Sequence, residues 1–286
     1  MFTIEQLPHQ QLHLNNQNTL DFSQPQIMGI LNVTPDSFSD GGEYQRIDNA
    51  VQHALQMQAD GASIIDIGGE STRPNAPEVS LQQELDRVMP IVEALKPYHL
   101  NLSIDTSSPE VMRQAVAAGA SIWNDVRALT RPNALQTARE LNIPVILMHN
   151  RGEPATMNSL AVYEDVMAEI LCELQQRIDD ALNAGIAKHH IIIDAGFGFA
   201  KNSHQNLILL KYCKQLNKLG YPILAGLSRK RFIGELLNQA DVKDRDIASS
   251  MAHLWCVQQG ASIVRTHNVK AMSDSLKVWQ AICQTD

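Results

Sequence analysis

The stretch ASIIDIGG at residues 62–69 contains the pattern that decides the fold. It is a short run of apolar and β-branched residues that ends in glycine, which is typical of a strand buried on both faces of a parallel sheet. The same pattern occurs in QIMGILNV (26–33), LSIDT (102–106), SIWNDV (121–126), PVILMH (144–149), IIIDAG (191–196), PILAGLS (222–228) and SIVRTH (262–267). Together these runs predict eight strands of one parallel sheet.

Helical patterns alternate with the strand runs. Apolar residues recur every three or four positions in residues 81–95, where Ser80 and Gln83 form a capping box, and in residues 162–182 and 269–279. Strand followed by helix, eight times, is the order of an α/β protein with the (β/α)₈ TIM-barrel fold. The main alternative is a doubly wound open sheet, whose GxGxxG phosphate fingerprint is absent after the first strand.

Length and composition agree with one large domain. The chain has 286 residues, of which 44% are hydrophobic and 19% are charged, and this is enough for a single packed core. We expect a single-domain barrel over residues 25–286. The segment 1–24 precedes the first barrel strand, and we expect it to cover the barrel floor.

Charge and cysteine usage exclude several function classes. A net charge of −8 leaves no broad basic surface for a nucleic acid or an anionic membrane. The four cysteines are scattered without a CxxC pair, which predicts reduced thiols rather than a metal site. The N-terminus lacks a secretory signal pattern and no apolar run approaches the length of a membrane span, so we expect a cytoplasmic protein.

Polar residues stand where most of the strand runs end. In a (β/α)₈ barrel these carboxyl ends form the mouth that carries the reactive groups. The residues are Asn32, Thr72, Arg73, Asp105, Asn124, Asp125, His149, Asp194, Ser228, Arg229, Lys230, Arg265 and His267. One mouth therefore gathers amides, carboxylates and cations.

The residue types at this mouth suit a charged heterocycle. Carboxylates and amides inside a barrel are costly to bury unless a ligand donates hydrogen bonds to them. Asp194 is suited to accept two parallel N–H bonds from an amidine-like edge, with Asn124 and Asp105 completing the outline and Lys230 facing a ring nitrogen or carbonyl. A separate cationic set suits a phosphate, diphosphate or carboxylate: Arg73, Arg265 and His267. A heterocycle bearing a diphosphate fits both sets.

Several of these residues also have a structural interpretation. For Asp40 and Asp125 we favour helix capping or turn formation, whereas Asp66 and His149 are open between a structural and a functional role. Four basic residues near the seventh strand could instead form a face that only contacts solvent. They are Arg229, Arg231, Lys243 and Arg245.

Six longer motifs resemble those of the dihydropteroate synthases. They are NVTPDSFSDGG (32–42), GGESTRP (68–74), IDTS (104–107), DAGFGFAK (194–201), GLSRK (226–230) and RTH (265–267), in family order across residues 27–268. The resemblance implies a transferase that joins 6-hydroxymethyl-7,8-dihydropterin diphosphate to 4-aminobenzoate in folate biosynthesis. It also implies Mg²⁺ as a cofactor, and no nucleic-acid or membrane partner.

The resemblance assigns roles to individual residues. It implies a pterin pocket at Asp105, Asn124, Asp194 and Lys230, and catalytic roles for Asp105, Lys230 and Arg265. It implies a diphosphate site at Asn32, Arg73, Arg265 and His267, with Asn32 as a ligand of Mg²⁺. It implies a 4-aminobenzoate site, which sulfonamides mimic in this family, at Phe38, Thr72, Pro74, Phe197 and Ser228. Two loops, 33–42 and 71–79, would close over the mouth.

The implied mechanism agrees with what the mouth lacks. Diphosphate leaves the pterin methylene in an SN1-like step, and the electron-rich dihydropterin stabilises the developing cation. The aniline nitrogen then attacks without a strong base, while the loops exclude water. Consistently, the sequence offers no Ser-His-Asp set and no catalytic thiol at the mouth.

Some positions depart from the family pattern. Ala195 and Ala200 replace a proline and a glycine, Ser108 stands where lysine is common, and Asn150 and Asn268 replace a methionine and an aspartate. None of these changes removes a residue assigned above to the pterin or the diphosphate, so they bear on loop geometry and inhibitor response.

The helix expected before the eighth strand carries an apolar stretch around Met251, Leu254 and Trp255. Together with the family resemblance, this stretch predicts a homodimer face.

Two other functions compete with this interpretation. A methyltetrahydrofolate:corrinoid methyltransferase would share the Asp and Asn pocket, but it needs no diphosphate site, and the TPDSFSDGG loop, SRK and Arg265-x-His267 argue against it. A non-enzymatic pterin-binding paralogue is the second alternative, and Arg73, Lys230 and Arg265 argue against it.

Overall fold

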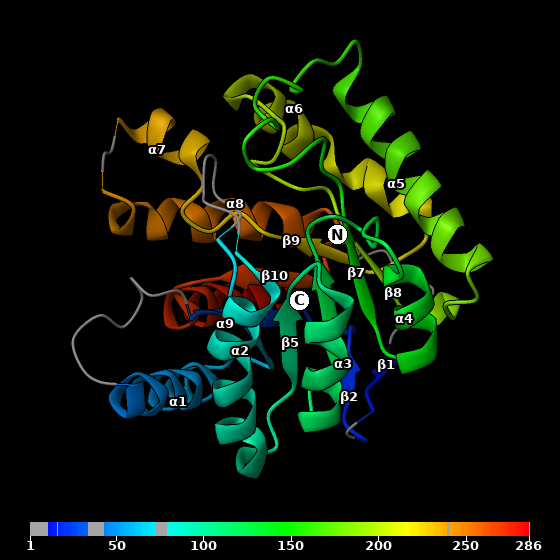
Figure 1. Cartoon of the computed structure of the whole chain (residues 1–286). Coiled ribbons are helices and arrows are strands. Elements are labelled where there is room, and N and C mark those ends of the chain that lie inside the picture. Colours follow the sequence, from blue (N-terminus) through cyan, green and yellow to red (C-terminus); the bar gives the residue numbers. More distant parts are fainter. Residues whose placement is uncertain (1–10, 16, 34–42, 72–78, 239–240, 286) are drawn as a thin grey trace.

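The computed structural model of the chain describes residues 11–15, 17–33, 43–71, 79–238 and 241–285 (Figure 1). Its centre is a closed barrel of parallel strands in the order β10-β3-β4-β5-β6-β7-β8-β9. The strands are β3 (Gln26–Asn32), β4 (Ile64–Gly68), β5 (Leu102–Asp105), β6 (Ile122–Asp125), β7 (Val145–Met148), β8 (Ile191–Asp194), β9 (Ile223–Ala225) and β10 (Ile263–Thr266). The predicted TIM barrel and each of its predicted strands are confirmed.

Helices surround the barrel (Figure 1). They are α1 (Glu43–Ala59), α2 (Leu81–Leu95), α3 (Pro109–Ala118), α4 (Ala134–Leu141), α5 (Val166–Asn183), α6 (Ser203–Tyr212), α7 (Arg231–Leu237), α8 (Asp246–Gln258) and α9 (Val269–Gln284). Short 3₁₀ helices lie between them: η2 (Lys96–Tyr98), η3 (Lys188–His190), η4 (Cys213–Leu219) and η5 (Lys243–Arg245).

Capping explains where two of these helices begin. The capping box of Ser80 and Gln83 opens α2, as the sequence predicts. The periodicity over residues 162–182 places the start of α5 too early, because Asp165 caps the helix by accepting hydrogen bonds from Met167 N and Ala168 N. Val162 therefore lies before α5, and its side chain is exposed.

The N-terminal segment forms a hairpin of β1 (Gln11–His13) and β2 (Thr19–Asp21), paired antiparallel. Four of its apolar residues share one buried cluster with residues near the beginnings of the barrel strands: Leu12, Leu14, Leu20 and Phe22 with Met28, Ile64, Ile122, Ile146, Ile192, Leu224 and Ile263. The hairpin therefore packs against the end of the barrel opposite the predicted mouth. A second, larger cluster fills the space between strands and helices.

None of the helices in the described part of the chain combines the length and apolar character needed to cross a bilayer. The cytoplasmic location stays a prediction.

Candidate active site

An ion-paired cluster crosses the barrel near the carboxyl ends of its strands. Arg265 of β10 places Nε 2.6 Å from Asp66 Oδ2 on β4 and Nη2 2.7 Å from Asp105 Oδ2 on β5. Asn124 of β6 donates from Nδ2 to Asp66 Oδ2 over 3.1 Å. Since β10 and β5 are not neighbours in the sheet, these contacts pass through the barrel interior. Side chains from four strands therefore meet at one buried point.

This cluster holds two carboxyl groups against one guanidinium. Burial raises the pKa of Asp105 to about 7, Arg265 opposes the shift, and the nearby carboxylate of Asp66 adds to it. The second oxygen of Asp66, Oδ1, is buried without a hydrogen-bond partner in the described part of the chain. A ligand that donates N–H groups would therefore stabilise the negative charge of the carboxylates and provide hydrogen bonds to their unused oxygens.

Asn32 lies beside this cluster. A β-carbon on Gly68 would come 3.5 Å from Asp105 Cβ and 3.8 Å from Asn32 Oδ1, so both side chains stand over the same glycine. Asn32 is half-buried at the last position of β3 and pairs with Gly68 in the sheet. The amide of Asn32 and the carboxylate of Asp105 thus share one side of the mouth.

A second pair of charged residues comes from the far side of the barrel. Asp194, the last residue of β8, accepts a hydrogen bond from Gly196 N to Oδ1 over 2.7 Å. Its Oδ2 lies 3.7 Å from where a β-carbon on Gly226 would stand, so this oxygen faces a position without a side chain. One carboxylate oxygen is fixed by the backbone, and the other faces this open position.

Lys230 stands next to this carboxylate. Its Nζ is 4.2 Å from the centre of the Phe199 ring. Burial lowers the pKa of Lys230 to about 8, while Asp194 acts in the opposite direction and Arg265 adds to the lowering. Lys230 is therefore a cation at neutral pH that loses its proton more easily than a surface lysine.

Ser228 and His267 link the ends of the last two strands. The Ser228 hydroxyl lies 2.9 Å from His267 Nδ1 and accepts a hydrogen bond from His267 N over 3.0 Å. These two predicted site residues are therefore in direct contact.

The interpretation of a solvated face after β9 is wrong for two arginines. Arg229 donates to both oxygens of Asp246, at 2.7 and 2.9 Å, and Arg245 Nη1 donates to Arg229 O over 3.2 Å. Arg231 and Lys243 are exposed. The two arginines shape the segment that presents Ser228 and Lys230, because Asp246 of α8 holds the Arg229 side chain and Arg245 of η5 holds the Arg229 carbonyl group.

Asp125 has the structural role that the sequence favours. Its carboxylate accepts hydrogen bonds from Arg127 N at 2.9 Å, from Leu129 N at 2.8 Å and from the hydroxyl of Ser107. Asp125 therefore shapes the loop after β6. Asp40 lies outside the described residues.

Arg127 is a residue that the sequence analysis missed. It donates to both oxygens of Glu70 at 3.1 Å, to Glu153 at 2.8 Å and to Ser107 Oγ at 2.9 Å. It therefore ties together the segments that follow β4, β5 and β7. No sequence spacing indicates these contacts, because Glu70 lies 57 positions away.

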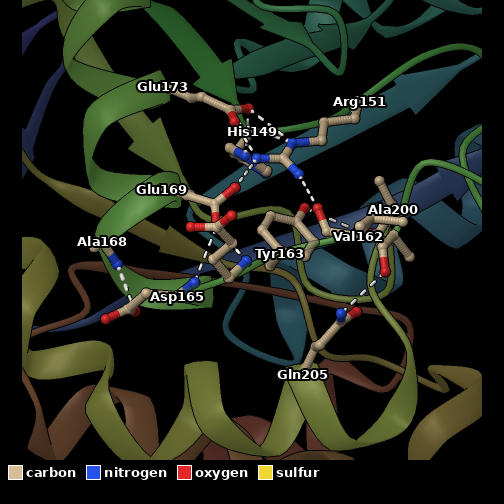
Figure 2. Close-up of polar contacts among 12 residues, drawn as sticks. His149, Arg151, Val162, Tyr163, Asp165, Ala168, Glu169, Glu173, Ala200 and Gln205 are labelled. Atoms are coloured by element: carbon tan, nitrogen blue, oxygen red, sulfur yellow. Dashed lines mark hydrogen bonds and ion pairs between the residues drawn. The ribbon is translucent and has the colours of Figure 1, made fainter.

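A second missed group surrounds His149, which Figure 2 shows together with Arg151 and Glu173. His149 Nε2 lies 3.0 Å from Glu173 Oε2, and its Nδ1 lies 3.0 Å from Lys201 Nζ. Arg151 pairs with the same Glu173 and stacks 3.9 Å above the ring of Tyr163. His149 is thus a fully engaged buried histidine, and the sequence quoted Lys201 within DAGFGFAK without giving it a role.

Phe197, for which the resemblance implies a contact with 4-aminobenzoate, is a buried residue, and that role stays a prediction. Its side chain is only 2% exposed and belongs to the core between strands and helices. The ring that faces the charged residues is Phe199, two positions later. The turn at Gly196 and Gly198, both with positive φ, directs the two rings to different sides.

Four further predicted residues, Phe38, Thr72, Arg73 and Pro74, lie outside the described residues, as do most of the two loops that carry them. Within the described ranges, no group of three or more His, Cys, Asp or Glu side chains is arranged to hold a metal ion.

Comparison with known proteins bears directly on this arrangement. A family model described as pterin binding enzyme matches residues 28–267. The dihydropteroate synthase of Haemophilus influenzae is 51% identical over 271 residues, which cover 94% of this chain and 98% of that protein. The dihydropteroate synthase of Escherichia coli K12 is 46% identical over 264 residues, covering 92% and 93%. The chain belongs to the dihydropteroate synthase family. It is accordingly a transferase, as the sequence predicts.

Solved dihydropteroate synthases have the same fold. The Xanthomonas albilineans enzyme with 4-aminobenzoic acid superimposes with a TM-score of 0.91 at 46% identity and covers 97% of this chain and 99% of its own. The same enzyme in complex with 7,8-dihydropteroate gives a TM-score of 0.88 at 44% identity and covers 96% and 100%. A Yersinia pestis dihydropteroate synthase solved with a sulfonamide drug gives 0.91 at 45% identity and covers 96% and 100%.

Proposed function

We propose that this chain condenses 6-hydroxymethyl-7,8-dihydropterin diphosphate with 4-aminobenzoate to give 7,8-dihydropteroate and diphosphate. One observation carries the proposal: two sets of hydrogen-bond acceptors lie on opposite sides of one barrel mouth. Asp194 forms one set, with Lys230 nearby, and the Asp66–Asp105–Asn124 cluster forms the other. A pterin offers a matching edge of N–H donors together with ring acceptors. The family membership supports the same substrate class.

Asp194 and Lys230 bind opposite kinds of atoms on the pterin. With Gly196 N on one oxygen, the Asp194 carboxylate has its other lone pairs for parallel N–H donors of the amidine-like edge. Lys230 donates to a ring nitrogen or carbonyl oxygen, and its charge lowers the pKa of Asp194, which burial raises. Asn124 and Asp105 complete the outline of the ring. The bond that breaks, between the methylene carbon and the diphosphate oxygen, then lies toward the strand ends.

Arg265 and His267 provide positive charge and hydrogen-bond donors for the diphosphate. Arg265 is fixed in orientation by Asp66 and Asp105, and one-fifth of its side chain is exposed. A guanidinium held in place beforehand stabilises developing negative charge without reorganising during the reaction. Arg73 adds to this set in the sequence prediction.

Mg²⁺ fits the donor chemistry beside Asn32. The amide oxygen of Asn32 is a hard ligand next to the Asp105 carboxylate, and Mg²⁺ in enzymes uses one or two protein oxygens together with substrate phosphates. When bound, the cation would neutralise part of the charge of the leaving diphosphate. Asn32 is the ligand that this chain contributes in the proposal.

The 4-aminobenzoate site is proposed at Ser228 and Phe199, near the end of β9. Ser228 is held by His267, and Phe199 lies against Lys230, so both side chains are fixed beside residues of the proposed pterin and diphosphate sites. The aniline nitrogen attacks as diphosphate departs, and no side chain needs to act as a strong base. Contributions from Phe38, Thr72, Pro74 and Phe197 stay predictions.

A homodimer through α8 is part of the proposal. Ile247, Met251 and Trp255, spaced by four residues on one helix, have exposed side chains, and Ile247 is 85% exposed. Apolar side chains gathered on one helix face are unusual on a monomer surface and favour a protein contact.

Diphosphate release by the purified protein tests the proposed reaction. We expect release only when pterin diphosphate, 4-aminobenzoate and Mg²⁺ are all present, with 7,8-dihydropteroate formed in equal amount. Binding of the pterin diphosphate without release would favour the non-enzymatic paralogue. Methyl transfer from methyltetrahydrofolate to cobalamin would favour the methyltransferase.

A further inference from the structure

Lys201 is buried, with 4% of its surface exposed, although it carries an ammonium group. Its Nζ lies 3.0 Å from Gly196 O, 2.9 Å from Phe199 O and 3.0 Å from His149 Nδ1. An ammonium has three N–H donors and no acceptor, so these contacts use its whole hydrogen-bonding capacity. The amine of Lys201 is therefore fully hydrogen-bonded inside the protein, unlike that of a surface lysine, which extends to water.

The contact with Lys201 fixes the protonation of His149. Because the ammonium can only donate, Nδ1 accepts, and the ring proton is on Nε2, which donates to Glu173. Burial and the charge of Lys201 lower the pKa of His149 to about 4, so the ring is neutral near pH 7. Arg151 donates to the same carboxylate of Glu173, as Figure 2 shows. Lys201 is thus connected through a neutral ring to a fixed carboxylate.

Both carbonyl partners of Lys201 belong to the turn that separates the proposed pterin ligands. Gly196 donates its N–H to Asp194, and the ring of Phe199 lies against Lys230. A β-carbon on Gly198, in the same turn, would stand 2.9 Å from Lys230 Cδ. Lys201 therefore holds the two ends of a turn whose first residues fix Asp194 and whose last residues pack on Lys230.

Lys201 also adds positive charge near Asp194. Burial raises the pKa of Asp194, whereas the Gly196 N–H, Lys230, Lys201 and Arg265 lower it. Burial likewise lowers the pKa of Lys201 to about 7. Asp194 and Glu173 oppose this shift, and the charges of Lys230 and Arg151 add to it. The ionised carboxylate is the form that accepts two N–H bonds from a pterin, so nearby positive charge favours binding.

We propose that Lys201 is a positioning residue of the pterin pocket, which fixes the turn 196–199 through two carbonyl groups and adds positive charge on the side of Asp194. This inference rests on the proposed function for its consequence in pterin binding, but the effect on Asp194 is a property of the free protein. Lys201 itself makes no contact with the substrate in this proposal.

Three variants separate charge from packing. Lys201→Gln removes the charge but keeps two amide N–H donors for the carbonyl groups, and Lys201→Arg keeps the charge. Lys211→Gln removes an exposed lysine of α6 and serves as the control. In each variant, the ¹³C signal of the Asp194 carboxyl, assigned with Asp194→Asn, is titrated, and the affinity for the pterin diphosphate is measured by calorimetry from pH 5.5 to 8.5.

We expect Lys201→Gln to raise the pKa of Asp194 by about one unit or more, since a removed neighbouring cation has that effect. Pterin affinity at pH 6.5 then falls about 10-fold and recovers as the pH rises, whereas Lys201→Arg retains affinity and Lys211→Gln behaves as wild type. A purely structural role of Lys201 would lower affinity equally at every pH.

An unchanged Asp194 titration in Lys201→Gln overturns the inference. If Lys201→Gln does not fold, Lys201→Met is measured in its place. If neither variant folds, Lys201 is required for folding and the positioning role is rejected. If the wild-type protein binds no pterin diphosphate, the proposed function fails instead, while the Asp194 titration still tests the effect of Lys201.

Discussion

Asp194 and Lys230 carry most of the proposed recognition at the scale of single residues. One side chain accepts and the other donates, and both are positioned by the turn 196–199 and by Phe199. Because both lie at the mouth, neither supports the hydrophobic core. Their removal is therefore expected to change binding far more than folding.

Asp194→Asn and Lys230→Ala should each lower kcat/KM for the pterin diphosphate by about 10- to 100-fold or more, because a hydrogen bond to a charged group contributes about 1.5–3 kcal/mol. Steady-state kinetics and a thermal melt on the same samples provide the check. Arg231→Ala, at an exposed position of α7, is the matched control. Near-wild-type turnover in either site variant would contradict the assignment.

The pH dependence of the reaction should report on Lys230. Burial lowers the pKa of Lys230 to about 8, and the protonated amine forms the stronger, charge-assisted hydrogen bond to the ring, so kcat/KM falls as the pH rises through that value. Lys230→Arg should remove this alkaline decline even where it lowers the rate. A pH profile that is flat to pH 10 in the wild type would contradict this role.

The sequence predicted the strand-end residues but not the contacts that hold them. Asp105, Asn124, Asp194 and Arg265 follow or end apolar runs, and the barrel rule then places them at one mouth. Lys201 and His149 are 52 positions apart, and Arg127 and Glu70 are 57 apart, so no local pattern indicates these pairs. The choice between Phe197 and Phe199 depends on the backbone of one turn, which residue types alone leave open.

At the scale of elements, the turn between β8 and α6 is closely constrained by its neighbours. Gly196 has φ +66°, and a β-carbon there would stand 1.9 Å from His149 O. Asn206, buried on α6, accepts from Gly198 N over 2.7 Å. Contacts with the His149 carbonyl group and the Asn206 side chain therefore determine the conformation of this turn. Ala195 and Ala200, which depart from the family pattern, are buried at its two ends.

Gly196→Ala should destabilise the protein by more than about 2 kcal/mol, because the new methyl group combines a left-handed backbone with a direct overlap. Gly220→Ala is the matched control: its φ is +75°, but nothing lies within 4 Å of the added carbon, so the cost should be about 1 kcal/mol. Urea unfolding of both variants measures the difference. Equal costs would show that the contact with His149 O does not constrain the turn.

The order of elements was easier to predict than their ends. Eight apolar runs fixed the strands, since a strand buried on both faces needs such a run. The start of α5 was missed because Val162 continues the helical spacing of the apolar residues, while the cap at Asp165 determines where the helix begins. The N-terminal hairpin has strands of three residues, too short to give a periodic pattern.

The whole molecule is a barrel surrounded by helices (Figure 1), with the candidate site at one end and the hairpin at the other. Exposed apolar side chains lie on α8. The predicted homodimer belongs to this scale. Ile247→Asp places a charge at the most exposed of the three residues of the proposed contact and should convert a dimer to a monomer in sedimentation velocity. Val162→Asp, at a similarly exposed apolar residue before α5, should leave the assembly unchanged. A wild-type protein that sediments as a monomer at micromolar concentration would contradict the dimer.

The central claim concerns the reaction at the barrel mouth, and the amounts of its two products test it most directly. Purified protein is incubated with 6-hydroxymethyl-7,8-dihydropterin diphosphate, 4-aminobenzoate and Mg²⁺, and diphosphate and 7,8-dihydropteroate are quantified together. The account predicts equal amounts of both products and none of either when 4-aminobenzoate is omitted. Diphosphate without dihydropteroate, or neither product from a folded protein that binds the pterin, would contradict it.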